Sequence, residues 1–301
     1  MSGIVERHFI WIISAFSTLA LLEPTYFIWL KPYVTLLLGI ILLGIGFSID
    51  SSDVNSTFEN RGIICFAILS RYFLMPVAAF FIGKFLQLPM MEFVGLIILG
   101  TCPGGTAANV MSYLSRGNIA LTVILTFGTT LMAPIMMPTL IYVFLKKEIV
   151  VPFFEMANNI FLVVFIPLML GLIIKKYFGN VAKHLARVFP VISIFAISLA
   201  IACIMSLSQE RILDFPLLII TAAILFNITG YFIGFLTSKT LNCNPSDQKS
   251  IFFEFGMLDA GLGSIIATHF FGPVAALPSA FISILQNITA SFFVKRFRTA
   301  T

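Results

Sequence analysis

Hydrophobic positions along the chain fall into long stretches that short polar connections separate. A helix needs about 20 apolar residues to cross the hydrocarbon of a bilayer, and most of these stretches approach that length. They predict ten transmembrane helices, at residues 9–28, 33–49, 62–83, 93–115, 118–144, 152–174, 187–206, 215–238, 249–270 and 274–294. The first stretch is interpreted as a membrane helix and not as a cleaved signal peptide, because it lacks an A-x-A cleavage site after a short basic region.

Two of the predicted helices are interrupted by glycine, one near the end of each half of the chain. The fourth contains Cys102-Pro103-Gly104-Gly105-Thr106, and the ninth contains Asp259-Ala260-Gly261-Leu262-Gly263. Five helices per half is an odd number, so the second half has to enter the membrane from the opposite side. We therefore expect two inverted repeats, residues 1–150 and 151–301. Their breaks are expected to face a cavity or an ion, where freed backbone groups find partners.

Composition and charge agree with a protein whose main solvent is lipid. Of the 301 residues, 59% are hydrophobic and 10% are charged, whereas a soluble domain carries about 25% charged residues. The net charge of +5 does not indicate nucleic-acid binding, because most of the 18 Lys and Arg residues lie in loops on one side of the predicted topology. The positive-inside rule then places both termini in the cytoplasm.

Three ionisable side chains fall inside predicted helices: Arg71 in the third, and Glu254 and Asp259 in the ninth. A charge at the bilayer centre costs about 2.5–3.5 kcal/mol even on the insertion scale, so such residues either pair or serve an ion or substrate. A carboxylate beside carbonyls freed by a helix break is typical of a site for a hard cation such as sodium. The structural alternative is a buried ion pair that only joins helices.

Hydroxyl and amide side chains gather near the same breaks. Thr122 and Thr126 are four residues apart, so they share one face of the fifth predicted helix, and Thr106 and Asn109 flank the first break. A single Thr in a membrane helix usually bonds back to its own backbone. As a group beside two breaks, these side chains are candidate ion ligands.

Other classes of protein fit the pattern less well. The four cysteines are scattered without the spacing of a metal site or a disulfide framework. An intramembrane aspartyl protease lacks its G-x-G-D signature here, so no enzymatic activity and no cofactor are expected. A channel or a ligand-binding receptor would not need two inverted, broken repeats, which are typical of alternating access in secondary transporters.

The broken segments carry a resemblance to a known family. Residues 102–109 read CPGGTAAN, residues 112–117 read SYLSRG, and residues 254–262 read EFGMLDAGL. In these motifs, in length and in the order of the breaks, the chain resembles the bile acid:sodium symporter family. The resemblance implies a panel of helices 1, 2, 6 and 7 beside a core of helices 3–5 and 8–10, with broken helices 4 and 9 crossing at mid-membrane. It also implies a sodium-coupled carrier of small organic anions, bile-acid-like or pantoate-like, in a bacterial inner membrane.

Carried over by position, the family's first sodium site falls on four residues, although a serine of the family pattern is Ala108 here. These ion-binding residues are Asn109, Thr122, Thr126 and Glu254. The resemblance likewise implies a substrate site or pocket at Thr106, Asn109, Asp259 and Asn287.

The second sodium site departs from the family pattern. Arg71 stands where the family usually has Gln, and Leu258-Asp259 stands where it usually has Gln-Asn. Our hypothesis is that the Arg71 guanidinium occupies the second sodium position, with Glu254 or Asp259 as its counter-ion, because a sodium ion beside it would be strongly repelled. One sodium ion or none then moves per cycle.

Asp259 raises a second question, because a carboxylate near the substrate disfavours an organic anion unless Arg71 neutralises it or it is protonated. Burial in a low dielectric favours the neutral form of a carboxyl group. A proton-coupled or uncoupled carrier of the same fold, with Asp259 or Glu254 as the proton site, is therefore the alternative. Substrate identity, oligomeric state and the direction of transport stay open at this point.

Overall fold

The computed structural model describes residues 9–34, 36–37, 39–40, 43, 61–207, 209–210 and 216–299. Within these ranges the chain is all-helical, and its only β-type pairing is an isolated bridge between Gly104 and Leu258. The elements are α2 (Phe9–Leu22), α3 (Thr25–Ile28), η1 (Lys31–Tyr33), α6 (Arg61–Phe85), α7 (Met90–Thr101), α8 (Ala107–Leu114), α9 (Ile119–Leu145), α10 (Phe153–Ile160), η3 (Phe161–Phe165), α11 (Ile166–Tyr177), α12 (Gly179–Leu207), α14 (Pro216–Thr240), α15 (Pro245–Gly256), α16 (Ala260–Phe271), η4 (Pro273–Ala276) and α17 (Leu277–Thr299).

Five helical stretches among the described residues are long and apolar enough to cross a membrane: Arg61–Phe85, Ile119–Leu145, Phe153–Tyr177, Leu217–Thr240 and Pro273–Phe297. Shorter apolar helices accompany them, and two of these, α7 and α16, belong to the interrupted segments. The prediction of an all-α membrane protein is confirmed. The predicted helix at 33–49 lies largely outside the described residues, and the ten-helix inverted repeat stays a prediction.

The ninth predicted helix breaks earlier than the sequence analysis placed it. The break was expected at residues 259–263, but α15 ends at Gly256 and α16 begins at Ala260. Asp259 is the residue before α16, and its carboxylate accepts a hydrogen bond from the backbone N–H of Leu262 at 3.0 Å. A side chain that caps the first turn in this way favours the start of a helix at the next residue.

The glycines of α16 lie inside that helix and were wrongly interpreted as the break, and the role of Gly263 is packing. A Cβ atom on Gly263 would lie 2.8 Å from Ser279 Oγ and 2.9 Å from Cys102 Sγ, which leaves no room for a side chain. Gly263 therefore lets α7 and α17 approach the surface of α16 closely. A glycine in an apolar stretch indicates close approach as readily as it indicates a break.

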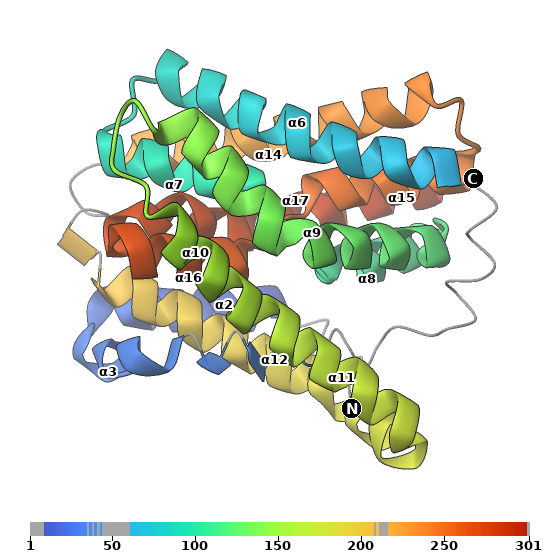
Figure 1. Cartoon of the computed structure of the whole chain (residues 1–301), viewed down its shortest axis with the longest axis horizontal. Helices are drawn as coiled ribbons and strands as arrows, with labels where there is room; N and C mark the ends of the chain where they lie inside the picture. Colours follow the sequence, from blue (N-terminus) through green and yellow to red (C-terminus); the bar gives the residue numbers. More distant parts are fainter. Residues whose placement is uncertain are drawn as a thin grey trace.

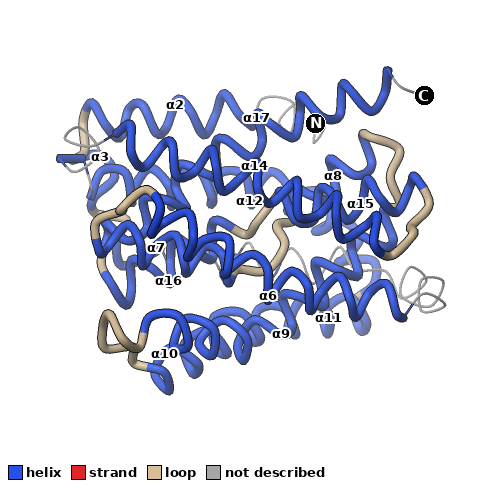
Figure 2. Tube along the Cα trace, turned by 90° about the horizontal axis from the view of Figure 1, so that it is seen from above, coloured by secondary structure: helices blue, strands red, loops and turns tan. Residues whose placement is uncertain are grey.

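Figure 1 shows the helices in two neighbouring groups, and Figure 2 shows the same helices from above. In one group α2 and α3 pack on α12, which also contacts α11. In the other, α7 packs on α6, α6 on α14 and α14 on α15, with α8, α9, α16 and α17 completing the assembly. α10 and η3 pack on α9, and α12 touches α16 and α17. The interrupted helices α7–α8 and α15–α16 thus lie inside the second group.

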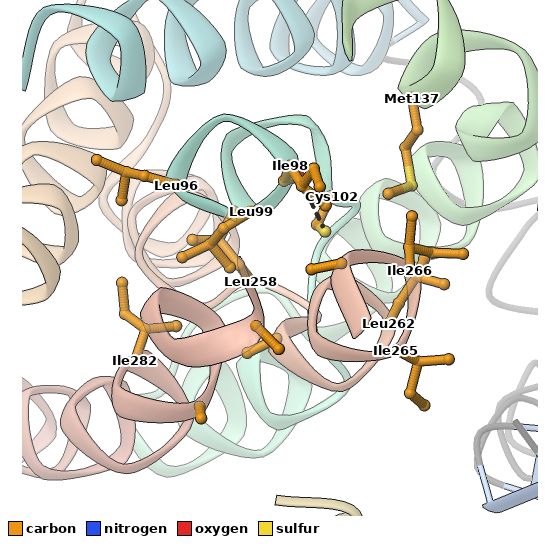
Figure 3. Packing of buried hydrophobic residues seen from close by; sticks show 14 of the residues in the cluster. Leu96, Ile98, Leu99, Cys102, Met137, Leu258, Leu262, Ile265, Ile266 and Ile282 are labelled. Atoms are coloured by element: carbon orange, nitrogen blue, oxygen red, sulfur yellow. Dashed lines mark hydrogen bonds between the residues drawn. The ribbon is translucent and has the colours of Figure 1, made fainter. Parts of the chain in front are cut away.

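Buried apolar side chains fill the space around the breaks. Figure 3 shows Leu99 and Cys102 of the α7 segment near Leu258 and Leu262, where the interrupted helices meet. Each of these side chains is almost completely buried. The Glu254 and Arg71 side chains near the crossing are buried as well, so an unpaired polar atom on either of them is costly.

Candidate functional site

The two helix breaks contact each other through their backbones. The N–H of Gly105 donates to the carbonyl of Met257 at 2.8 Å, and the N–H of Asp259 donates to the carbonyl of Pro103 at 2.9 Å. Gly105 is required at this contact, because a Cβ there would lie 2.7 Å from the carbonyl oxygen of Leu258. The crossing therefore brings the C-terminal ends of α7 and α15 next to the first turns of α8 and α16.

Arg71 of α6 reaches the C-terminal ends of both interrupted helices. Its buried guanidinium donates to the backbone carbonyl of Glu254, in the last turn of α15, and to that of Cys102, which caps α7, at 3.3 Å. The carbonyls at a helix C-terminus carry partial negative charge and attract a cation. No carboxylate oxygen of the described residues lies within 4.0 Å of the guanidinium nitrogens. The hydrogen-bond partners of Arg71 are thus carbonyls, and the ion pair with Glu254 or Asp259 stays a prediction.

Two amide side chains that the sequence analysis missed pair with the rest of the second break. Gln286 of α17 accepts from the N–H of Leu258 at 3.0 Å and donates to the carbonyl of the same residue at 3.1 Å. Asn227 of α14 donates to the carbonyl of Gly256 at 2.8 Å. An amide inside an apolar helix was the available signal for both residues, since a buried amide needs polar partners.

The Glu254 carboxylate is buried beside the first break. Its Oε2 accepts a hydrogen bond from the hydroxyl of Thr126 at 2.8 Å, whereas its Oε1 has no hydrogen-bond partner in the described part of the chain. Gly104 makes room for this carboxylate, because a Cβ at Gly104 would lie 1.7 Å from Oε1. A buried carboxylate oxygen without a partner is costly unless a cation or a proton satisfies it.

Asn109 and Thr126 complete an oxygen cluster with Glu254. The Thr126 hydroxyl lies 3.3 Å from Oδ1 of Asn109, 2.8 Å from Oε2 of Glu254 and 3.0 Å from the carbonyl of Thr122. A hydroxyl carries a single hydrogen, so at most one of these three acceptors is satisfied by it at any moment. The cluster holds more acceptors than donors, which is the arrangement that a hard cation needs.

Thr122 lies one turn before Thr126 on the same face of α9, but its hydroxyl has other partners. It donates to the hydroxyl of Ser112 at 2.9 Å and lies 3.1 Å from the carbonyl of Asn118. The structure therefore brings Asn109, Thr126 and Glu254 into direct contact and places Thr122 in an adjoining layer.

The expected substrate residues are distributed differently. Thr106 precedes α8 and Asp259 precedes α16, so both lie at the crossing, and both are partly exposed. Asp259 uses its carboxylate to cap α16, whereas the Thr106 side chain caps nothing. Asn287 is buried in α17, donates to the carbonyl of Ser283 in its own helix at 2.7 Å, and has an Oδ1 without a partner among the described residues.

Comparison with known proteins identifies the family. The model of the sodium bile acid symporter family matches residues 35–215, which is more than half of the chain. The chain belongs to this family. An uncharacterized sodium-dependent transporter of Bacillus subtilis, YocS, is 36% identical over 282 residues, covering 94% of this chain and 88% of the relative.

More distant relatives come from eukaryotes. A probable sodium/metabolite cotransporter of Arabidopsis chloroplasts, BASS1, is 32% identical over 91% of this chain and 69% of its own length. The rat hepatic sodium/bile acid cotransporter is 26% identical over 85% of this chain and 72% of its own length. The family and these relatives are transporters and not enzymes, so the chain is an integral membrane protein of a sodium-dependent transport family.

Proposed function

We propose that the protein is a secondary active transporter that moves small organic anions by alternating access and couples their movement to sodium. The coupling site is formed by Asn109, Thr126 and Glu254, with Thr122 joining them when the ion is bound. The observation that carries this proposal is the buried Glu254 carboxylate, whose Oε1 has no partner among the described residues. Beside it, three further oxygen atoms compete for one hydroxyl hydrogen. A sodium ion at this point satisfies all of them.

The proposed architecture is ten helices in two inverted five-helix repeats, residues 1–150 and 151–301. Each repeat contributes one interrupted helix, followed by a turn and one long helix: α7–α8 before α9, and α15–α16 before α17. Helices 1, 2, 6 and 7 form a panel, and helices 3–5 and 8–10 form a core that carries the crossing to mid-membrane. Both termini face the cytoplasm, and the membrane is the inner membrane of a bacterium.

We further propose that Arg71 takes the place of a second sodium ion. Three carbonyls beside the second break are already paired: that of Glu254 with Arg71, that of Gly256 with Asn227, and that of Leu258 with Gln286. The Cys102 carbonyl at the end of α7 is also paired with Arg71. The fixed guanidinium supplies the positive charge that two helix C-termini attract. One sodium ion per cycle therefore suffices.

The substrate is proposed to bind beside the crossing, near Thr106, Asn109, Asp259 and Asn287. Its class is a small carboxylate, either bile-acid-like or pantoate-like. The Asp259 carboxylate caps α16 and so occupies the first-turn N–H groups that could otherwise hold an anion. The Thr106 side chain does not cap α8, so the substrate carboxylate is placed near the start of that helix, where the helix dipole favours an anion.

Proton coupling is the second candidate function, and the position of Asp259 favours it. This carboxyl group is partly exposed at the crossing, where it can exchange a proton with water as the site opens. Uptake into proteoliposomes separates the two functions. A sodium gradient at constant pH drives the sodium-coupled carrier, and a pH gradient without sodium drives the proton-coupled one.

The sodium site is tested with the purified protein in sodium-free detergent solution. Sodium chloride is expected to raise the unfolding temperature in a saturable manner, because binding to the native state stabilises it by mass action. Potassium chloride at equal ionic strength is the control for a general salt effect. The Glu254→Gln variant keeps the shape of the side chain and removes its charge, so its response to sodium is expected to disappear. Equal stabilisation of the wild-type protein by both salts would contradict the proposal.

A further inference from the structure

A second polar layer lies directly beside the proposed sodium site. The three helices that carry the site, α8, α9 and α15, contact one another and lie together in Figure 1. Each contributes a second polar side chain three or four residues from its site residue. These are Ser112 on α8, Thr122 on α9 and Ser250 on α15. Such spacings place a residue one helical turn away on the same face, so the three hydroxyls form a layer next to the first.

The three hydroxyls are hydrogen-bonded in a row and are fully buried. The Thr122 hydroxyl donates to that of Ser112 at 2.9 Å, and the hydroxyls of Ser112 and Ser250 lie 3.0 Å apart. The row ends at the carbonyl of Asn118, which accepts from the Ser250 hydroxyl at 2.7 Å. Because all three side chains are buried, water does not compete for these hydrogen bonds.

The Asn118 carbonyl lies against both ends of the row: the Ser250 hydroxyl donates to it at 2.7 Å, and the Thr122 hydroxyl lies 3.1 Å from it. A carbonyl can only accept, so the single hydrogen of Ser250 points at Asn118. Ser112 must then be the donor in its bond with Ser250. The single hydrogen of Thr122 thus has Ser112 or Asn118 as its acceptor, and its oxygen keeps lone pairs that can bind a cation.

Glycine permits the close approach of these hydroxyls. A Cβ on Gly117 would lie 2.6 Å from Ser112 Oγ and 3.1 Å from Ser250 Oγ. The turn that contains Gly117 is in turn held by Asn118, whose side chain donates to Asp247 at 2.7 Å. The end of the row is thus anchored on the junction between the α8–α9 turn and the start of α15.

We infer that Ser112 and Ser250 are positioning residues that hold the oxygen of Thr122 ready to bind sodium. This inference rests on the proposed sodium site and adds two residues to it. A hydroxyl that donates along a chain becomes a better acceptor, because hydrogen bonds in series polarise one another. A cation at the Thr122 oxygen strengthens the donated bond for the same reason. Ion binding and the anchored turn are therefore linked through the row.

The test measures sodium-induced thermal stabilisation of the purified full chain, with Ser112→Ala and Ser250→Ala as separate variants. Each removes one link of the row, and the sodium concentration for half-maximal stabilisation is expected to rise about tenfold, at the lower end of what residues that orient metal ligands contribute. The double variant is expected to show about the same shift as either single variant, because one missing link already interrupts the row. Unfolding temperatures in sodium-free solution report any purely structural effect separately.

Ser238→Ala is the matched control. Ser238 is a buried serine of α14 that donates to a carbonyl of its own helix, at Phe235, at 2.8 Å. Its replacement is expected to leave the sodium titration unchanged. If either Ser112→Ala or Ser250→Ala does not fold, the other serine variant decides the question by itself. A sodium titration like that of the wild-type protein in Ser112→Ala or Ser250→Ala would overturn the inference.

The same measurements separate failure of this inference from failure of the proposed function. If the wild-type protein does not respond to sodium, or if Glu254→Gln responds as the wild type does, the sodium site itself is refuted. If Glu254→Gln abolishes the response and the serine variants titrate normally, only the positioning role is refuted.

Discussion

Replacing Arg71 with glutamine is expected to add a sodium ion to the protein. The Arg71 guanidinium donates hydrogen bonds to the carbonyls of Cys102 and Glu254. The Arg71→Gln variant removes the fixed charge and leaves these carbonyls available to a cation. Its amide can still reach part of the space, so the crossing keeps a polar partner.

The magnitude follows from the distance between the two charges. A sodium ion bound by the same carbonyls would lie about 4 Å from the guanidinium, and at an effective dielectric constant of about 20 two positive charges at that separation repel by about 4 kcal/mol. This energy weakens binding by about three orders of magnitude, since each 1.4 kcal/mol is a factor of about ten. A site that binds sodium in the millimolar range without Arg71 is therefore empty at physiological concentrations with it.

Equilibrium binding of radioactive sodium to the purified protein measures this directly. About one ion per protein is expected for the wild type and about two for Arg71→Gln. Arg71→Lys is the matched control, because it keeps a positive charge and is expected to bind about one. Two ions bound by the wild-type protein, or no gain in Arg71→Gln, would refute the reasoning that the guanidinium stands in for an ion.

Three further substitutions test the crossing. Gly104→Ala places a Cβ against the Glu254 carboxylate, 1.7 Å from Oε1, and is expected to weaken sodium binding at least about tenfold in the thermal titration. Gln286→Leu leaves the Leu258 backbone without its amide partner and is expected to lower the free energy of unfolding by about 1–3 kcal/mol, measured in urea or by heat. Asp259→Asn keeps an equally good helix cap and removes a negative charge. It is therefore expected to bind carboxylate substrates more tightly with little change in stability, measured by counterflow.

For each of these three predictions, one result would contradict it. For the glycine, Gly62→Ala is the control, because a Cβ there meets nothing within 4 Å; equal sodium titrations of both alanine variants would remove Gly104 from the site. Unchanged stability of Gln286→Leu would mean that another group pairs with the break. Weaker carboxylate transport by Asp259→Asn would indicate that Asp259 carries a proton or contacts the substrate in its charged form.

The sequence by itself determined that lipid is the main solvent, that the fold is all-α, and where the first helix break lies. Lengths of apolar stretches depend only on neighbouring residues and on the thickness of a bilayer, so the helices at Arg61–Phe85 and Ile119–Leu145 were predicted within a few residues. The Pro-Gly-Gly run at residues 103–105 marked the first break correctly, because proline cannot continue a helix and two glycines weaken it.

Only the tertiary structure decided which polar groups meet. Arg71 and Glu254 are 183 residues apart in the sequence, and no local pattern indicates that the guanidinium contacts a carbonyl in preference to a carboxylate. The second break was misplaced for a related reason, since Gly263 is explained by Ser279 and Cys102 packing against it from other helices. Gln286 and Asn227 were missed because the partner of each buried amide is a backbone group of a distant segment, which the neighbouring sequence does not indicate. Tertiary packing determines which distant segments pair, and the residues next to any one position in the sequence do not determine that packing.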